Sequence, residues 1–245
     1  MAAFNAPVTA ALVAALEPWP SDEVLELAGG TGELAAVLAG RVARVVSTDL
    51  SPEMVEAARR RDLPGVEHRV MDMQAIDLPD ASFDSVVCRF GYMLAPDPAL
   101  AFRETRRVLR PGGRLAFATW APAKRNPWAT AFGPVLVERG LQEPPETGAA
   151  GQFALGEPER IESLVRAVGF DQVSVREVAV ESRFADWDDY KHVFTSLAAQ
   201  TRQLLESLDE STRAEVGDAA RARLEGFRTD EGYVIPGVAL VTSAS

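Results

Sequence analysis

Cysteine and basic residues are scarce in this sequence of 245 residues, and each scarcity excludes a class of site. Because Cys88 is the single cysteine, the chain can form no internal disulfide and no cysteine-rich zinc site. Lysine and arginine number 25 against 36 acidic residues, which gives a formal net charge of −11. Proteins that bind nucleic acid neutralise phosphates with basic residues. We therefore expect no nucleic-acid partner, and expect the arginine-rich stretch 103–114 to be a solvated helix face and loop.

Long apolar runs are also missing from the sequence. No run approaches the length of about 20 residues that a membrane-spanning helix needs. The first sixteen residues lack the basic start and apolar core of a secretory leader, and their apolar spacing predicts an amphipathic helix. We therefore predict no membrane span and a cytoplasmic location. The length and ordinary composition predict one α/β domain.

Short apolar runs alternate with helical patterns in the first half of the chain, which is typical of a parallel sheet flanked by helices. The expected strands are 24–27, 42–48, 66–70, 83–89, 114–120, 173–180 and 234–242. The expected later helices are 33–38, 51–61, 97–109, 129–138 and 161–168, and all of 186–228 has a helical pattern. Pro111-Gly112-Gly113 is expected to break the chain before the fifth strand, and Pro236-Gly237 to interrupt the last one.

A glycine-rich turn follows the first expected strand, where residues 24–33 read Val-Leu-Glu-Leu-Ala-Gly-Gly-Thr-Gly-Glu. Glycine at such a turn lets a ligand approach the backbone closely. Alone, the turn leaves three interpretations open. It is a tight turn without a ligand, or the dinucleotide fingerprint Gly30-x-Gly32-x-x-Ala35. The third interpretation is the acidic loop of S-adenosylmethionine (SAM) binders, which begins at Glu26 and has Ala28 in place of its first glycine.

Four further motifs separate these interpretations. Asp49 ends the second expected strand, roughly 20 residues after the loop, where a carboxylate can accept hydrogen bonds from ribose hydroxyls. It lies in Ser-Thr-Asp-Leu-Ser-Pro-Glu-Met-Val-Glu-Ala-Ala, at 47–58. Asp-Met at 72–73, then Leu-Pro-Asp and Ser-Phe-Asp-Ser-Val-Val within 78–87, and Leu-Arg-Pro-Gly-Gly-Arg-Leu at 109–115 follow in order. With the glycine turn, this series resembles class I SAM-dependent methyltransferases, and among them the ubiquinone/menaquinone-type small-molecule enzymes.

The resemblance implies a Rossmann-like α/β fold. Its seven-stranded, mostly parallel sheet would carry helices on both faces and a helical cap. Residues 1–245 would form a single class I methyltransferase domain, with a cofactor-binding core at 20–120 and cap insertions at about 121–152 and 184–231. SAM would be the cofactor and S-adenosylhomocysteine (SAH) the product.

The resemblance also assigns residues to the methionine end of SAM. It implies that Ala28, Gly30 and Gly32 carry backbone next to the methionine part. Glu26 assists there through its hydrogen-bond network rather than repelling the zwitterion. Arg89 would lie where the methionine end meets the acceptor.

The nucleoside end of SAM is assigned in the same way. Asp49 would hold the ribose, and Leu50 and Met54 would flank the adenine. Asp72 would accept a hydrogen bond from the adenine amino group, and Met73 would donate its backbone N–H to the ring.

The acceptor side carries fewer signals. Methyl transfer from a sulfonium is an in-line displacement that depends on positioning, and a base is needed only when the acceptor loses a proton. His192 is the candidate base, although an exposed helix histidine is the commoner case. Ligands of open α/β sheets bind beyond the carboxyl ends of strands. An apolar acceptor pocket is therefore expected there, with core packing as the even alternative, from Phe90, Tyr92, Met93, Trp120 and Trp128.

These observations predict a methyltransferase acting on a small, partly apolar acceptor, with oxygen slightly ahead of carbon or nitrogen as the methylated atom. No metal is expected, and the protein would be a monomer or homodimer. Two alternatives remain: a nicotinamide-dependent oxidoreductase using the same glycine loop, and a non-catalytic protein that binds a ligand or partner on the same fold.

Overall fold

The computed structural model describes residues 2–144, 146 and 148–245. The chain divides into two compact units. The first comprises Met1–Ala121, Gly148–Val178 and Ala239–Ser245, and the second comprises Pro122–Thr147 and Ala179–Val238. The two predicted insertions fall largely within the second unit, although 148–152 belong to the first.

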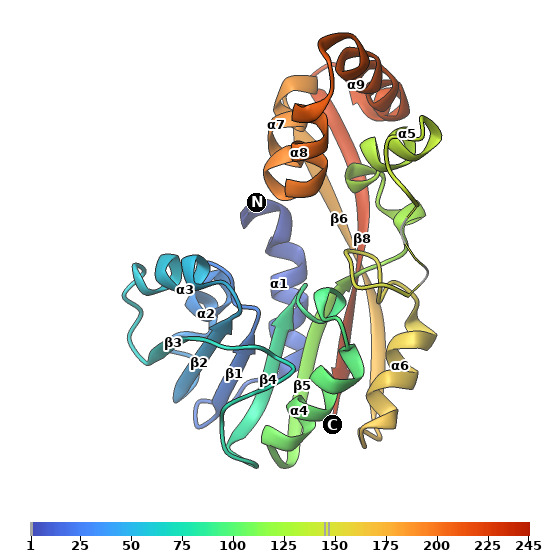
Figure 1. The fold of residues 1–245 in the computed structure, drawn as a ribbon. Coiled ribbons are helices and arrows are strands. Elements are labelled where there is room, and N and C mark those ends of the chain that lie inside the picture. The colour runs from blue at the N-terminus through green and yellow to red at the C-terminus, as the bar shows by residue number, and fades with distance from the viewer. Residues whose placement is uncertain (1, 145, 147) are drawn as a thin grey trace. The chain divides into compact units, whose positions relative to one another are not determined.

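The described residues form one eight-stranded sheet in the order β3-β2-β1-β4-β5-β8-β6, with β7 paired to β8 (Figure 1). Its strands are β1 (Glu23–Leu27), β2 (Arg44–Asp49), β3 (Val66–Val70), β4 (Phe83–Arg89), β5 (Leu109–Trp120), β6 (Val173–Phe184), β7 (Arg228–Thr229) and β8 (Gly232–Ala244). Strands β1 to β5 are all parallel to their neighbours among them, in the pairs β1–β2, β2–β3, β1–β4 and β4–β5. Strand β8 runs antiparallel to β5. The predicted α/β class and mostly parallel sheet are confirmed, and the two-residue β7 is the strand that the sequence pattern did not indicate.

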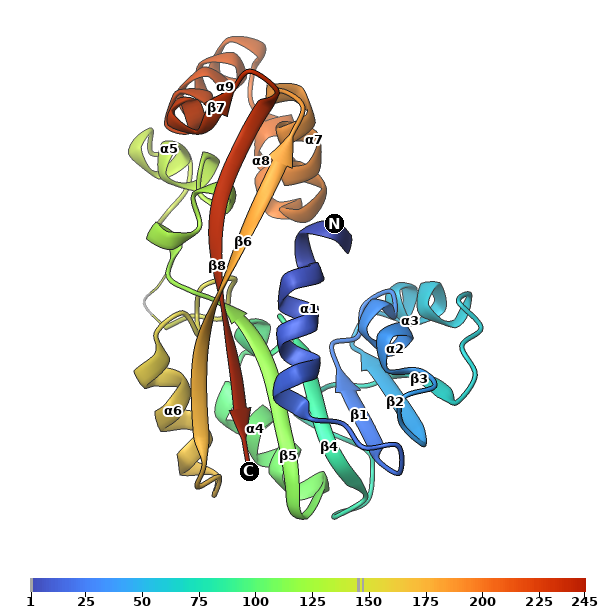
Figure 2. The same ribbon diagram turned by 180° about the vertical axis from the view of Figure 1, so that it is seen from behind.

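Helices cover both faces of the sheet in the first unit. They are α1 (Ala2–Leu16), α2 (Glu33–Leu38), α3 (Pro52–Arg59), α4 (Pro98–Val108) and α6 (Pro158–Ala167). Figures 1 and 2 show α1 on one face of β4 and β5 and α4 on the other. Two of these helices begin as the sequence predicted: the Ser51 side chain accepts a hydrogen bond from Met54 N, and Asp97 accepts one from Leu100 N.

The two proline-glycine segments expected to interrupt the chain lie within strands instead. The β4–β5 register shifts between Phe83 and Ser85, so Pro111-Gly112-Gly113 lies within an irregular start of β5, earlier than residue 114. Strand β8 continues through Pro236-Gly237. A Cβ on Gly237 would lie 2.8 Å from Trp128 Nε1, so glycine is required there for close packing rather than for a turn.

The second unit contains α5 (Phe132–Glu138), α7 (Trp187–Leu197), α8 (Ala199–Ser207) and α9 (Glu210–Leu224). Helices occupy most of 186–228, as the sequence predicted. The core of this unit is aromatic: the Phe132 ring stacks with those of Tyr190 and Phe194. None of the helices in the described parts of the chain is both long and apolar enough to cross a membrane.

Candidate cofactor site

The loops after β1 and β4 surround a pocket of about 290 Å³ at the carboxyl edge of the sheet. Because β1 pairs in parallel with both β2 and β4, the carboxyl ends of these strands meet at one edge. The pocket is lined by Asn5, Glu26, Ala28, Gly29, Gly30, Thr31, Glu33, Met54, Arg89 and Phe90. The structure thus brings five of the predicted cofactor residues and one predicted acceptor residue together.

Ala28 stands where the acidic SAM-binding loop has its first glycine, and its backbone explains that preference. Its φ of +53° lies in the left-handed region, which costs an L-residue about 1–2 kcal/mol. A Cβ on Gly91 would lie 2.5 Å from the Ala28 methyl group. The absence of a side chain at Gly91 therefore makes room for the alanine. The Ala28 side chain therefore fits without a steric clash. The free-energy cost of alanine at this position comes from its left-handed backbone conformation.

Gly29 is a close-approach position that the sequence interpretation did not single out. A Cβ there would lie 2.3 Å from Ser47 Oγ and 2.8 Å from Glu26 Oε2. A side chain at this position would therefore displace the Ser47 and Glu26 side chains, which favours glycine there.

Asp49 anchors the loop at the end of β2. Its Oδ2 accepts a 2.8 Å hydrogen bond from Gly30 N, and its Oδ1 accepts one of 2.9 Å from Ser51 N. An ionised carboxylate has about four acceptor positions, so two remain for further donors. The Asp49 carboxylate therefore holds the glycine loop and retains the capacity to bind hydroxyl groups.

Glu26 is buried at the base of the loop with 1% of its surface exposed. Burial raises the pKa of its carboxyl to about 7, because the nearby Ser47 side chain and Arg89 charge offset only part of the lost solvation. Among the described residues, its Oε2 accepts no hydrogen bond. This wall of the pocket therefore presents an oxygen in need of a donor.

Arg89 also lines the pocket and contacts two helices. Its guanidinium donates to Glu33 Oε2 at 2.8 Å and to Thr9 Oγ1 at 2.7 Å. Sequence reasoning found Arg89 from its strand end but missed Thr9 and Glu33, as well as Asn5 on the same helix as Thr9. The packing of α1 against β4 and β5 brings Asn5 into the pocket lining and Thr9 to Arg89, whereas Glu33 begins α2 directly after the glycine loop.

Of the residues predicted to surround the adenine, Met54 lines the pocket, whereas Leu50, Asp72 and Met73 are not among its lining residues. Leu50 and Met54 are 68% and 44% exposed. Asp72 follows β3, and its Oδ1 accepts from Gln74 N at 2.8 Å. The Met73 Cε lies 3.1 Å from where a Cβ on Gly91 would stand. Their roles toward adenine stay predictions.

The residues predicted to line an acceptor pocket separate into several environments. Phe90 lines the cofactor pocket and stacks on Trp120 with ring centroids 4.2 Å apart. Met93 is buried, and its carbonyl oxygen accepts from Gly151 N. Tyr92 is buried in the core: its ring packs on Phe102, and its hydroxyl shares a 2.6 Å hydrogen bond with a threonine hydroxyl of α4.

The two remaining predicted residues belong to the second unit. Trp128 is buried, its Nε1 donates to Asn126 Oδ1, and its carbonyl oxygen accepts from Tyr190. His192 is exposed on α7. Its role as a base and that of Trp128 toward an acceptor stay predictions.

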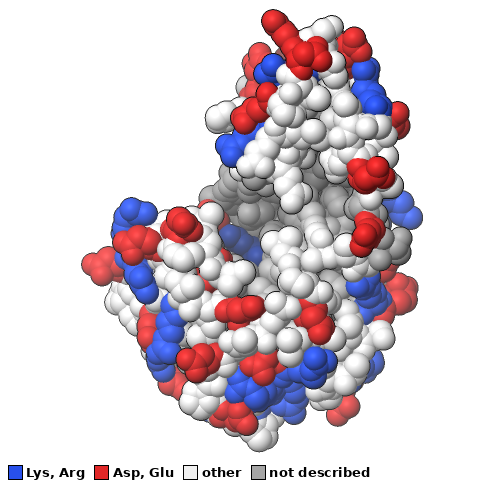
Figure 3. All heavy atoms as spheres, in the orientation of Figure 1, with Lys and Arg blue, Asp and Glu red and all other residues white. Residues whose placement is uncertain are grey.

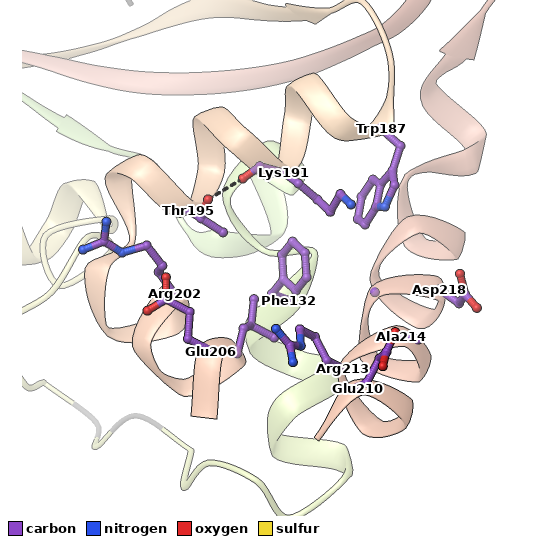
Figure 4. Close-up of a pocket in the computed structure, with 12 residues that line it drawn as sticks. Phe132, Trp187, Lys191, Thr195, Arg202, Glu206, Glu210, Arg213, Ala214 and Asp218 are labelled. Atoms are coloured by element: carbon purple, nitrogen blue, oxygen red, sulfur yellow. Dashed lines mark hydrogen bonds between the residues drawn. The ribbon is translucent and has the colours of Figure 1, made fainter. Parts of the chain in front are cut away.

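A separate pocket of about 740 Å³ lies within the second unit, among α5, α7, α8 and α9 (Figure 4). Phe132 and Trp187 form its aromatic part, with ring centroids 5.7 Å apart. The Lys191 ammonium lies 5.9 Å from the Trp187 ring centroid and pairs with Asp188. Its rim carries charges of both signs, including Arg202 and Glu206.

Basic and acidic side chains are interspersed on the face shown in Figure 3. Within the arginine-rich stretch 103–114, each arginine has a partner. Arg107, for example, bonds to both Asp80 and Glu104, and Arg106 lies over the Phe170 ring. Four of the five arginines are therefore paired with carboxylates.

A family model described as a methyltransferase domain matches residues 25–117. The demethylmenaquinone methyltransferase of Thermus thermophilus is 35% identical over 174 residues, covering 64% of this chain and 77% of that protein. The uncharacterised protein Rv1405c of Mycobacterium tuberculosis is 36% identical over 118 residues. The match covers 47% of this chain and 43% of Rv1405c, so it spans less than half of that relative.

The crystal structure of YcgJ from Bacillus subtilis resembles the whole chain, with a TM-score of 0.64 and 97% of each chain covered. Its sequence is 18% identical, so this likeness concerns the fold. The segment that the family model matches, 25–117, contains β4 and nearly all of β1, together with the loops after both strands, which line the pocket.

Proposed function

Because the chain belongs to the class I SAM-dependent methyltransferases, we propose that it transfers the methyl group of SAM to a small aromatic acceptor of the quinone type. The observation that carries the proposal is the convergence of the glycine loop, Asp49 and Arg89 at one edge of the sheet. The acceptor class is supported by the similarity to a demethylmenaquinone methyltransferase and by the aromatic pair at this edge.

The chemistry of the pocket fits SAM, which supplies a methyl group on a positively charged sulfur when it is bound. The backbone at Ala28 and Gly30 would border its methionine part, and no atom lies within 4 Å of a Cβ position on Gly30. The unpartnered Glu26 oxygen suits a donor group, and the free acceptor positions of Asp49 suit ribose hydroxyls. Met54, which is half-exposed at the rim, offers an apolar surface for the adenine.

Phe90, which lines the cofactor pocket, would orient the acceptor. The buried Trp120 holds the Phe90 ring in place, because the two rings are nearly parallel with an interplanar angle of 7°. A flat aromatic acceptor that stacks on Phe90 gains about 0.5–1.5 kcal/mol beyond its buried area. Holding the acceptor in line with the methyl group is the main catalytic task of these residues. A hydroxyl acceptor would also need a proton acceptor, for which His192 stays the candidate.

Turnover tests this proposal. The purified chain would be incubated with SAM and a panel of hydroquinones, phenols and amines, with SAH release and product mass as readouts. We expect SAH release together with an aromatic product heavier by one methyl group, and tandem mass spectrometry would assign the methylated atom. SAM binding without turnover of any aromatic acceptor, or turnover confined to aliphatic amines, would contradict the acceptor class.

A further inference from the structure

Asn5 on α1 is a polar residue in the pocket wall whose environment calls for a ligand. Its surface is 7% exposed, and it lines the same pocket as Glu26 and Gly30. Among the described residues, its Oδ1 accepts no hydrogen bond. A buried amide oxygen without a donor destabilises the protein unless something else supplies the donor.

The same pocket contains a second oxygen in this condition, Oε2 of Glu26. The two side chains come from two different elements, α1 and β1, which follow one another in the chain. Two unpartnered acceptors in one pocket are complementary to a group with several N–H donors and no acceptor, as an ammonium group has. Arg89 lies in the same lining and carries the charge that suits a carboxylate. The polar lining therefore suits the two ends of an amino acid zwitterion.

We propose that Asn5 binds the amino acid end of SAM, with its Oδ1 accepting a hydrogen bond from the α-ammonium group beside Glu26. Helix α1 is then part of the cofactor site. This inference rests on the proposed function, because it names one contact within the proposed SAM site. It also assigns α1 a task that the motifs between residues 24 and 120 do not contain.

The test separates the amino acid end of the cofactor from its nucleoside. SAH and 5′-methylthioadenosine, which lacks the amino acid, would be titrated calorimetrically into the full chain and into Asn5→Ala and Asn5→Leu. We expect SAH to bind about tenfold to a hundredfold more weakly to both variants, since a hydrogen bond to a charged group is lost. Methylthioadenosine should bind them as it binds the parent. Asn5→Leu should also match or exceed the parent in thermal midpoint, because it removes an unsatisfied oxygen.

Ala14→Gly is the matched control on the same helix. It lowers helix propensity and removes no polar atom, so both ligands should bind it as they bind the parent. Equal losses of SAH and methylthioadenosine in the Asn5 variants would indicate a merely structural role and overturn the inference. So would unchanged SAH affinity. A parent that binds neither ligand would overturn the proposed function as well, which keeps the two failures distinct.

Discussion

The cofactor pocket of the first unit and the aromatic pocket of the second unit are formed by different kinds of structural element. The first consists of strand-end loops, with backbone in left-handed conformations and buried oxygens without partners. The second consists of helix faces, with stacked rings inside and charges of both signs at the rim. The left-handed backbone of Ala28 and the unpartnered oxygens of Asn5 and Glu26 are in the lining of the first pocket, whereas the described lining of the second pocket has neither feature.

This difference indicates a division of tasks. Unsatisfied polar atoms and positive φ angles are retained where a ligand repays their free-energy cost. Helix faces that pack through side chains contribute to stability through their buried contacts. We therefore expect substitutions in the first pocket to alter cofactor binding, and substitutions in the second to alter stability.

Phe132→Ala should give the largest effect and affect the second unit. Phe132 is 2% exposed and stacks with several aromatic rings, so its removal should lower the free energy of unfolding by about 3–5 kcal/mol. At a temperature where the variant remains folded, its SAM affinity should equal that of the parent. Chemical denaturation and calorimetry measure the two quantities. A large loss of SAM affinity in the folded variant would contradict the expectation that the second pocket does not affect cofactor binding.

Glu26→Gln should change how the stability of the protein depends on pH. The folded-state pKa of about 7 lies above the ordinary value of 4.5, so the folded protein holds a proton that the unfolded chain releases. The contribution of Glu26 to stability is therefore fully present below about pH 4.5 and is lost as pH rises through 7. Above pH 7 the neutral glutamine should be more stable than the parent by about 3 kcal/mol.

Unfolding of the parent and Glu26→Gln across this pH range provides the measurement. The difference in their free energies should grow between about pH 4.5 and 7 and then level off. Glu23→Gln is a suitable control, because Glu23 is partly exposed on the same strand and paired with Arg110. A pH-independent difference for Glu26→Gln would contradict the buried, unpartnered carboxyl.

Asp49→Ala tests the ribose contact together with the loop anchor. Loss of hydrogen bonds to a charged group should weaken SAM by about 1.5–3 kcal/mol for each bond. Asp209→Ala is the matched control, since Asp209 accepts from Thr212 N at the start of α9 as Asp49 accepts from Gly30 N. The control should lose a helix cap and keep its SAM affinity. Equal SAM affinity in Asp49→Ala and the parent would show that the ribose site is misplaced.

Much of the sheet could be predicted from the sequence, because each strand and helix start in the first half has a local signal. Ser51 and Asp97 cap their helices as expected, and parallel pairing then brings the strand ends together. The unpredicted parts depend on contacts between distant segments. Arg89 meets Thr9 across 80 positions of sequence, and no spacing rule indicates such a contact. Tyr92 shows the same limit, since its packing on Phe102 is decided by α4.

Calorimetric titration of the full chain with SAM, SAH and NADPH in parallel tests the central claim, that the pocket after β1 binds SAM, most directly. We expect SAM and SAH to bind, with affinities lowered by Asp49→Ala, and NADPH to give no binding heat. Binding of NADPH alone would contradict the account and would make Gly30-x-Gly32-x-x-Ala35 a dinucleotide site.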